Sequence, residues 1–134
     1  MEIEKVEGTS DRLYSLVAPL VMRRSVLRQN NNYPFWTSRS HIWFVAMEGD
    51  AAVGFVPVEL KDNGSIKINN YYVAGDDGSQ LTALLGAVVH DYGGRCPICA
   101  VVHARHVPLF CAAGFSAVKE WKLFVKMEYG KSGK

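Results

Sequence analysis

Side chains that could take part in chemistry are concentrated in two short segments of the chain, residues 69–80 and 96–111. The first segment contains paired asparagines, paired tyrosines and the acidic turn Gly75–Gly78. The second contains two histidines, His103 and His106, and all three cysteines of the chain. An imidazole can transfer protons near neutral pH. The alternative is a structural role, in which a histidine at a strand end hydrogen-bonds to a neighbouring carbonyl. The motifs G-x-S-x-G and H-E-x-x-H and a Walker loop are all absent from the sequence.

The cysteines Cys96 and Cys99 have the C-x-x-C spacing that occurs in zinc sites and redox pairs. Zinc would need two further ligands, for which Cys111 with His103 or His106 are the candidates. A redox pair would open a helix, where the thiol pKa is lowered. Here both cysteines enter an apolar strand, so we expect Cys99 to pack in the core and no metal to bind.

Length and charge exclude several classes of protein. The 134 residues are enough for one domain, residues 1–134, with a single core. The net charge of +2 does not favour nucleic-acid binding, and no 18-residue apolar run predicts a membrane span. The N-terminus lacks the features of a signal peptide, so we expect a cytoplasmic protein. The polar residues 130–134 are expected to form a frayed tail.

The central part of the chain predicts one strand–helix–strand crossover. An apolar run at Ile66–Val73 precedes a periodic helix at Ser79–Tyr92, and a second apolar run follows at Ile98–His103. The two strands of such a unit lie parallel, and function usually lies where the first strand ends and the helix begins. Asn69 and Asn70 are unusual inside a strand and predict a bulge or a polar cleft.

The remaining pattern predicts helices and antiparallel strands. Ile3 and Val6 indicate a short edge strand, and the helix that follows is expected to end at Pro19. A hairpin is expected at Ile42–Met47 and Ala52–Leu60, with a bulge or a free edge at Pro57. Further elements are a short second helix, a helix from Pro108 and closing strands at Phe115–Trp121 and Leu123–Tyr129. The predicted fold class is therefore α+β, with a mixed, mostly antiparallel sheet, one parallel crossover and helices on both faces.

The order of these elements resembles that of the GCN5-related N-acetyltransferase (GNAT) superfamily over nearly the whole chain. The most specific likeness is the segment from His103 to Phe115, HARHVPLFCAAGF, in which a strand end leads to a short helix and a Gly-Phe pair. Val73 also matches the apolar residue that the family places before its cofactor loop.

The resemblance implies transfer of an acetyl group from acetyl-CoA to a small-molecule or peptide amine. It implies that the pantetheine arm pairs with free main-chain groups of residues 70–73, which include Tyr71, Tyr72 and Val73. It further implies that the pyrophosphate lies on the turn before the helix, at Gly78, Ser79 and Gln80, held by N–H groups and the helix dipole.

Two departures from the family pattern weaken this interpretation. The family loop, Arg/Gln-x-x-Gly-x-Gly/Ala, is about two residues longer than the loop here, and only Gly78 matches it. Asp76 and Asp77 would each oppose a pyrophosphate by about 1 kcal/mol. In addition, Phe110 stands where many members have a tyrosine that protonates the departing thiolate.

Several residues remain candidates for the chemistry that the resemblance implies. His103 and Glu59, which end neighbouring strands, are the expected bases that deprotonate the amine, and His106 is a further candidate. Asn70 is expected to contact substrate, together with Phe35 and Trp36 of an aromatic loop, unless that loop only caps the core. The alternative function is a catalytically inactive GNAT-like module that binds a ligand or a protein. A homodimer formed through an open sheet edge near Pro57 is the third hypothesis.

Overall fold

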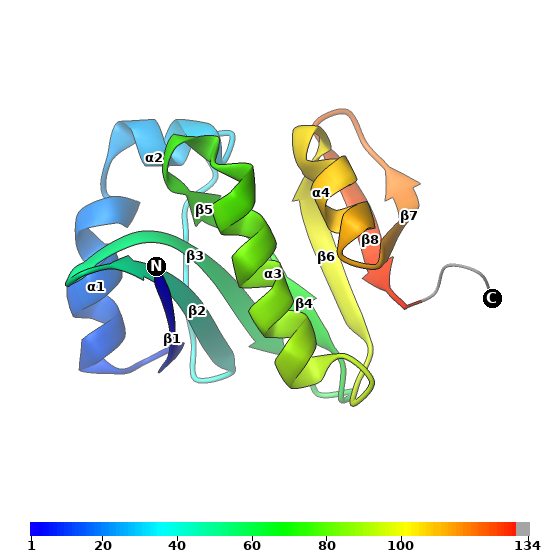
Figure 1. Cartoon of the computed structure of the whole chain (residues 1–134), viewed down its shortest axis with the longest axis horizontal. Helices are drawn as coiled ribbons and strands as arrows, with labels where there is room; N and C mark the ends of the chain where they lie inside the picture. The colour runs from blue at the N-terminus through cyan, green and yellow to red at the C-terminus, as the bar shows by residue number, and fades with distance from the viewer. Residues whose placement is uncertain (131–134) are drawn as a thin grey trace.

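The computed structural model describes residues 1–130, so all of the expected tail except Gly130 lies outside the described residues (Figure 1). The strands are β1 (Glu2–Glu7), β2 (His41–Glu48), β3 (Ala51–Leu60), β4 (Ile66–Ile68), β5 (Tyr72–Val73), β6 (Ile98–His103), β7 (Phe115–Glu120) and β8 (Phe124–Tyr129). The helices are α1 (Asp11–Val21), α2 (Arg24–Gln29), α3 (Gly78–Tyr92) and α4 (Val107–Ala112), with 3-10 turns η1 (Ala74–Asp76) and η2 (Ala104–His106). No helix within residues 1–130 is both long and apolar enough to cross a membrane.

All eight strands belong to one mixed sheet. Its order is β1-β2-β3-β4-β6-β8-β7, and β5 pairs with β3. Strands β4 and β6 are parallel and are joined through α3, whereas the other neighbours are antiparallel. The predicted α+β class with one parallel crossover is confirmed.

Helices cover both faces of the sheet because the side chains of each strand alternate between two cores. Phe44 of β2 packs on the α3 and α4 face, together with Leu81, Leu84 and Phe110. Trp43, its neighbour in the chain, packs on the opposite face against Leu13 and other apolar residues of α1. Helix α1 begins where Ser10 Oγ accepts a hydrogen bond from Leu13 N at 3.2 Å.

Two predictions about prolines are wrong. Pro19 does not end α1, which continues to Val21. The carbonyl that loses its helical partner belongs to Ser15 on the exposed face, where water can replace the missing N–H.

Pro57 does not mark a sheet edge, because β3 lies inside the sheet and Pro57 is paired with Trp43. Leu60 N–H bonds to Ser40 O, so it points toward β2. Successive main-chain nitrogens of a strand point to alternate sides, so the Pro57 nitrogen, three residues earlier, points away from β2. Neither β4 nor β5 pairs with Val56 or Pro57, and no ladder bond is lost there. The bulge of this hairpin lies instead at Ala46/Met47, and the homodimer hypothesis loses the free edge on which it depended.

Candidate functional site

The site is built around a place where the sheet stops pairing. The parallel β4–β6 ladder ends at Ile68 and Ala100. Beyond that point the chain turns away, and β5 pairs with Gly54 and Phe55 of β3 instead. In Figure 1, β5 (green) and β6 (yellow) lie well apart at the end that carries η1 and α4. The run Ile66–Val73 is therefore two short strands, not the single strand expected, and a gap separates residues 69–73 from residues 101–103.

Asn70 causes the interruption. Its φ of 56° places it in the left-handed region, which asparagine tolerates better than most residues. The amide of Asn30, buried at the end of α2, donates to Asn70 Oδ1 at 2.9 Å and to Tyr33 O at 3.1 Å. Helix α2 thus holds the bulge in place from the far side of the sheet.

The side chain of Tyr71 crosses the gap on the α3 and α4 face. Its phenol oxygen accepts a hydrogen bond from His103 N at 3.0 Å and lies 2.8 Å from His106 Nδ1. His106 Nε2 lies 2.8 Å from Asp76 Oδ1. Because a carboxylate only accepts, Nε2 carries the proton and the Tyr71 phenol donates to Nδ1. A buried phenol is therefore connected through one imidazole to a carboxylate at the surface.

Asp76 also joins the two turns that follow β5 and β6. Arg105 Nε donates to Asp76 Oδ2 at 2.9 Å, and Arg105 Nη2 donates to Asp76 Oδ1 at 3.2 Å and to Gln29 O at 3.1 Å. These exposed bonds connect η1, η2 and α2 at the open end of the gap. Asp76 has a φ of 55°, so the loop that carries it is held in a conformation unusual for an aspartate.

The surroundings determine the charge of each group. Burial, with the Arg105 and His106 charges, lowers the pKa of His103 to about 4. Burial also lowers the pKa of His106, although Asp76 opposes this shift. Partial burial opposes ionisation of Asp76, but bonds and charges from Arg105 and His106 outweigh it and lower the pKa of the carboxyl. Burial raises the pKa of Tyr71, so at neutral pH the site holds a protonated phenol and neutral imidazoles.

The start of α3, predicted to hold a pyrophosphate, is capped by its own aspartate. Asp77 Oδ1 accepts from Ser79 N at 2.9 Å, from Gln80 N at 3.3 Å and from Ser79 Oγ at 2.7 Å. The Ser79 hydroxyl, then the two N–H groups, lower the pKa of Asp77. The N–H groups of Ser79 and Gln80 already have an anionic partner. Gly78 approaches Leu109 of α4, which a β-carbon at that position would meet at 3.4 Å.

The Gln80 side chain does not point to this helix terminus. A β-carbon built on Gly54 of β3 would lie 2.5 Å from Gln80 Oε1. That oxygen is buried and has no hydrogen-bond partner among residues 1–130. The side chain therefore lies between α3 and the sheet.

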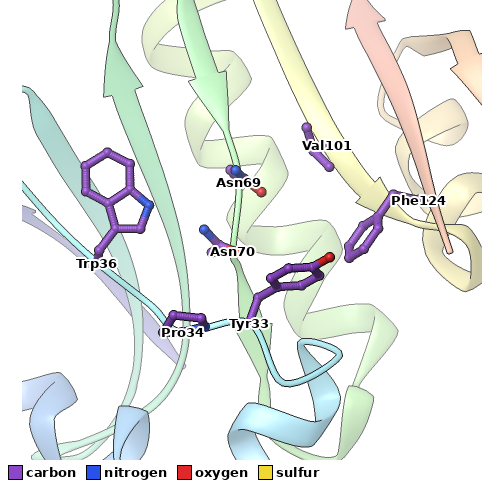
Figure 2. A pocket seen from close by; sticks show the side chains of 7 residues that line it. All are labelled: Tyr33, Pro34, Trp36, Asn69, Asn70, Val101 and Phe124. Carbon is purple, nitrogen blue, oxygen red and sulfur yellow. The ribbon is translucent and has the colours of Figure 1, made fainter. Parts of the chain in front are cut away.

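A cavity of about 390 Å³ opens beside the gap, and Figure 2 shows its lining. Asn69 and Asn70 come from the segment between β4 and β5, and Val101 comes from β6. The aromatic lining consists of Tyr33 and Trp36 from the loop after α2 and Phe124 from β8, and Pro34 completes the set. Of the expected aromatic contacts, Trp36 lines the cavity, whereas Phe35 does not and packs edge-on against Phe55 at 5.2 Å between ring centroids.

Neither Glu59 nor His103 lines this cavity. Glu59 lines a much smaller adjoining cavity of about 10 Å³, which shares Trp36, Asn69 and Asn70 with the larger one. His103 is 2% exposed, lies behind Phe124 at 5.1 Å between ring centroids, and is not among the lining residues. Asn31 Nδ2 lies 3.3 Å from His103 Nδ1. The gap thus brings together Asn70, Tyr71 and His103, whereas Glu59 approaches from β3.

Other sequence candidates take simpler roles. Tyr72 packs against Phe55 on the α1 face, and Val73 is buried on the α3 face. The three cysteines are free thiols, with Cys99 only partly buried. Within residues 1–130, no three His, Cys, Asp or Glu side chains are arranged to hold a metal ion.

Sequence reasoning did not identify Tyr33, Val101 or Phe124 as cavity residues, nor Arg105 as the partner of Asp76. The aromatic loop was a signal for Tyr33, since exposed aromatic residues in loops often line sites. No local signal exists for the other three, because their partners are distant in the sequence.

The chain was compared with known proteins. No protein-family model matches the sequence, and no curated protein matches it. Among solved structures, Escherichia coli ElaA superposes with a TM-score of 0.75 at 14% identity, covering 96% of this chain and 98% of ElaA. An acyl-CoA N-acyltransferase from Pseudomonas aeruginosa gives 0.73 at 15% identity, covering 97% of this chain and all of that one (100%). The aminoglycoside 6'-N-acetyltransferase from Enterococcus faecium gives 0.67 at 11% identity, covering 96% of each.

The superpositions extend over nearly the full length of each chain. At such low identity the likeness establishes the fold. The chain therefore has the GNAT fold, as the resemblance of its sequence predicted.

Proposed function

We propose that the chain is an acyl-CoA-dependent N-acyltransferase that transfers an acetyl group from acetyl-CoA to a primary amine. The observation that carries the proposal is the end of the β4–β6 ladder at Ile68 and Ala100. Past this point neither residues 69–73 nor residues 101–103 have a strand partner across the gap. Main-chain groups without a strand partner can pair with an extended amide-containing arm, as an added strand does.

The position of the cavity supports the same function. Residues Asn69, Asn70 and Val101 border both the gap and the cavity, so an amine bound there would lie next to an acyl group in the gap. Bringing two reactants together in this way is a large part of catalysis. The amine nitrogen would attack the thioester carbon, the C–N bond would form, and the C–S bond would break with its electron pair on sulfur.

Glu59 is a better proton acceptor for the amine than His103. It lines the small cavity that adjoins the amine site, and its carboxylate lies 3.7 Å from Lys61 Nζ. His103 has a pKa of about 4 and is buried behind Phe124, so it takes up a proton poorly at neutral pH.

The pyrophosphate end of the cofactor fits less well. Asp77 occupies the N–H groups of α3, and Asp76 adds a second negative charge. The Tyr71 phenol already bonds to His103 N across the gap. These contacts favour the second candidate, a GNAT-fold module that binds a ligand other than acetyl-CoA and has no catalytic activity.

Calorimetry with acetyl-CoA distinguishes the two functions. The acyltransferase predicts binding in the micromolar to low millimolar range and release of free thiol when a suitable amine is added. The absence of binding at millimolar acetyl-CoA would exclude it and leave the binding module. Binding without thiol release from any amine in a broad set would also favour the module.

A further inference from the structure

We propose that the cavity beside Asn69 and Asn70 takes a primary amine carried on an uncharged aromatic body, and that it disfavours polyamines and other polycations. The proposal names the substrate class of the site proposed above, so its catalytic part rests on that function. The binding part concerns the cavity alone and is tested separately.

Aromatic rings form the walls of this cavity. The rings of Tyr33 and Phe124 lie 5.9 Å apart between centroids, at an angle of 57°, on one side (Figure 2). Trp36 lies on the other side, with the two asparagines between them. Tyr33 and Trp36 are 56% and 54% exposed, which is a large apolar area left open to solvent beside a hollow. A flat ring placed between these walls would bury that area and meet several ring faces and edges.

The polar groups of the cavity are amides and not charges. None of its seven lining residues is Asp, Glu, Lys or Arg. Asn70 already accepts from Asn30, but none of the residues the structure describes hydrogen-bonds to the Asn69 side chain. The Asn69 amide is therefore available to orient one polar group of a ligand.

Within residues 1–130, Glu59 is the carboxylate that lines the adjoining small cavity, and Lys67 lines it too. Lys61 Nζ lies 3.7 Å from the same carboxylate. One carboxylate that already has basic neighbours can accept one ammonium group, which suits a ligand with a single positive charge. A ligand with three or more ammonium groups would leave most of them without a carboxylate among aromatic walls, at a cost in desolvation.

The size of the cavity agrees with this class of ligand. A volume of about 390 Å³ lies at the lower end of the range for small-molecule sites, roughly 300–1,000 Å³. A ring with a short aminoalkyl chain matches this space better than an oligosaccharide.

Calorimetry with three probes, 2-phenylethylamine, 2-phenylethanol and spermidine, tests the binding part on the full chain without acetyl-CoA. We expect 2-phenylethylamine to bind about tenfold or more tightly than spermidine. Trp36→Ala and Phe124→Ala should each weaken its binding about tenfold. Trp121→Ala is the matched control: Trp121 is 46% exposed in the β7–β8 turn and does not line the cavity, and alanine keeps its main-chain bond to Phe124 O, so binding should be unchanged.

A second variant tests the charge. Glu59→Gln should weaken the binding of 2-phenylethylamine and leave the binding of 2-phenylethanol unchanged, because only the amine carries a positive charge that the Glu59 carboxylate can pair with. The proposal would be overturned if Glu59→Gln weakened the binding of both probes equally. It would also be overturned if the chain bound spermidine more tightly than 2-phenylethylamine, or if Trp36→Ala and Trp121→Ala changed binding equally. If 2-phenylethylamine binds as expected but no amine releases thiol from acetyl-CoA, the proposed function fails and the ligand class stands.

Discussion

The phenol oxygen of Tyr71 accepts a hydrogen bond from the main-chain N–H of His103 at 3.0 Å. One side chain thus replaces the strand pairing that ends at Ile68 and Ala100. The same phenol lies 2.8 Å from His106 Nδ1, and Tyr71 is only 3% exposed. The buried Tyr71 phenol therefore bridges the gap in the sheet, and an arm that pairs with His103 must displace it.

Removing that group tests the bridge. Tyr71→Phe should lower the free energy of unfolding by about 1–3 kcal/mol, because His103 N–H and His106 Nδ1 both lose a buried partner. Urea denaturation followed by circular dichroism measures the change. Tyr14→Phe is the control, since Tyr14 is 47% exposed on α1 and should change stability little. Equal stability of the two variants would show that the bridge does not hold the gap.

The charge of Asp76 is expected to oppose acetyl-CoA. Asp76→Asn should tighten the binding of CoA by roughly fivefold, since one like charge near a phosphate contributes about 1 kcal/mol. The variant should lose little stability, because the ion pair with Arg105 is exposed and an asparagine oxygen can still accept from His106 Nε2. Asp62→Asn makes the same change of net charge in the exposed turn before β4 and should have a much smaller effect. Weaker binding in Asp76→Asn than in Asp62→Asn would mean that Asp76 assists the cofactor.

The buried histidines make stability depend on pH. Burial lowers the pKa of His103 from about 6.5 in the unfolded chain to about 4 in the folded chain. The unfolded state therefore binds more protons between these values, so stability is fully present above pH 6.5 and falls as the pH drops toward 4.

Histidine variants show which residue causes the pH dependence of stability. His106 and His41 have lowered pKa values too, and they contribute a slope of the same sign. His103→Asn should reduce the slope of unfolding free energy against pH between 6.5 and 4. His90→Asn, which removes an exposed histidine on α3, is the control for this change. A slope in His103→Asn as steep as in the wild type would show that His103 titrates normally.

The bulge at Asn70 can be tested through its backbone conformation. Asn70→Gly keeps a residue suited to a φ of 56° and loses only the hydrogen bond from Asn30, which should lower the free energy of unfolding by about 1 kcal/mol. Asn70→Ala loses the same bond and adds the strain of a left-handed alanine, about 1–2 kcal/mol more. Denaturation of both variants should rank alanine as less stable than glycine. The reverse order would mean that glycine's extra freedom in the unfolded chain outweighs the strain.

Local patterns predicted the elements that local physics determines. The spacing of Leu81, Leu84, Leu85 and Val88 predicts which face of α3 packs in the core, and all four side chains are fully buried. Phe110 and Phe115, on either side of the Gly114 turn, are buried as a short helix and strand require. The gap was expected from the resemblance, and the asparagines indicated where the strand would be interrupted.

Contacts between residues far apart in the chain could not be predicted from the sequence. The bond between Asn30 and Asn70 joins residues 40 positions apart, and the Asp76–Arg105 pair joins residues 29 apart. Neither residue type nor spacing specifies such a partner. Phe124 alternates with buried Val125 along β8, and its place as a wall of the cavity depends on neighbours that are distant in the sequence.

Amide chemical shifts during a titration with acetyl-CoA test the central claim most directly. With the chain labelled with ¹⁵N, the largest shift changes should fall on the amides of residues 69–73 and 101–103, which border the gap. His103 N–H should change most, because it must exchange the Tyr71 phenol for the cofactor. An unchanged spectrum at millimolar acetyl-CoA, or changes confined to residues far from β5 and β6, would contradict the account.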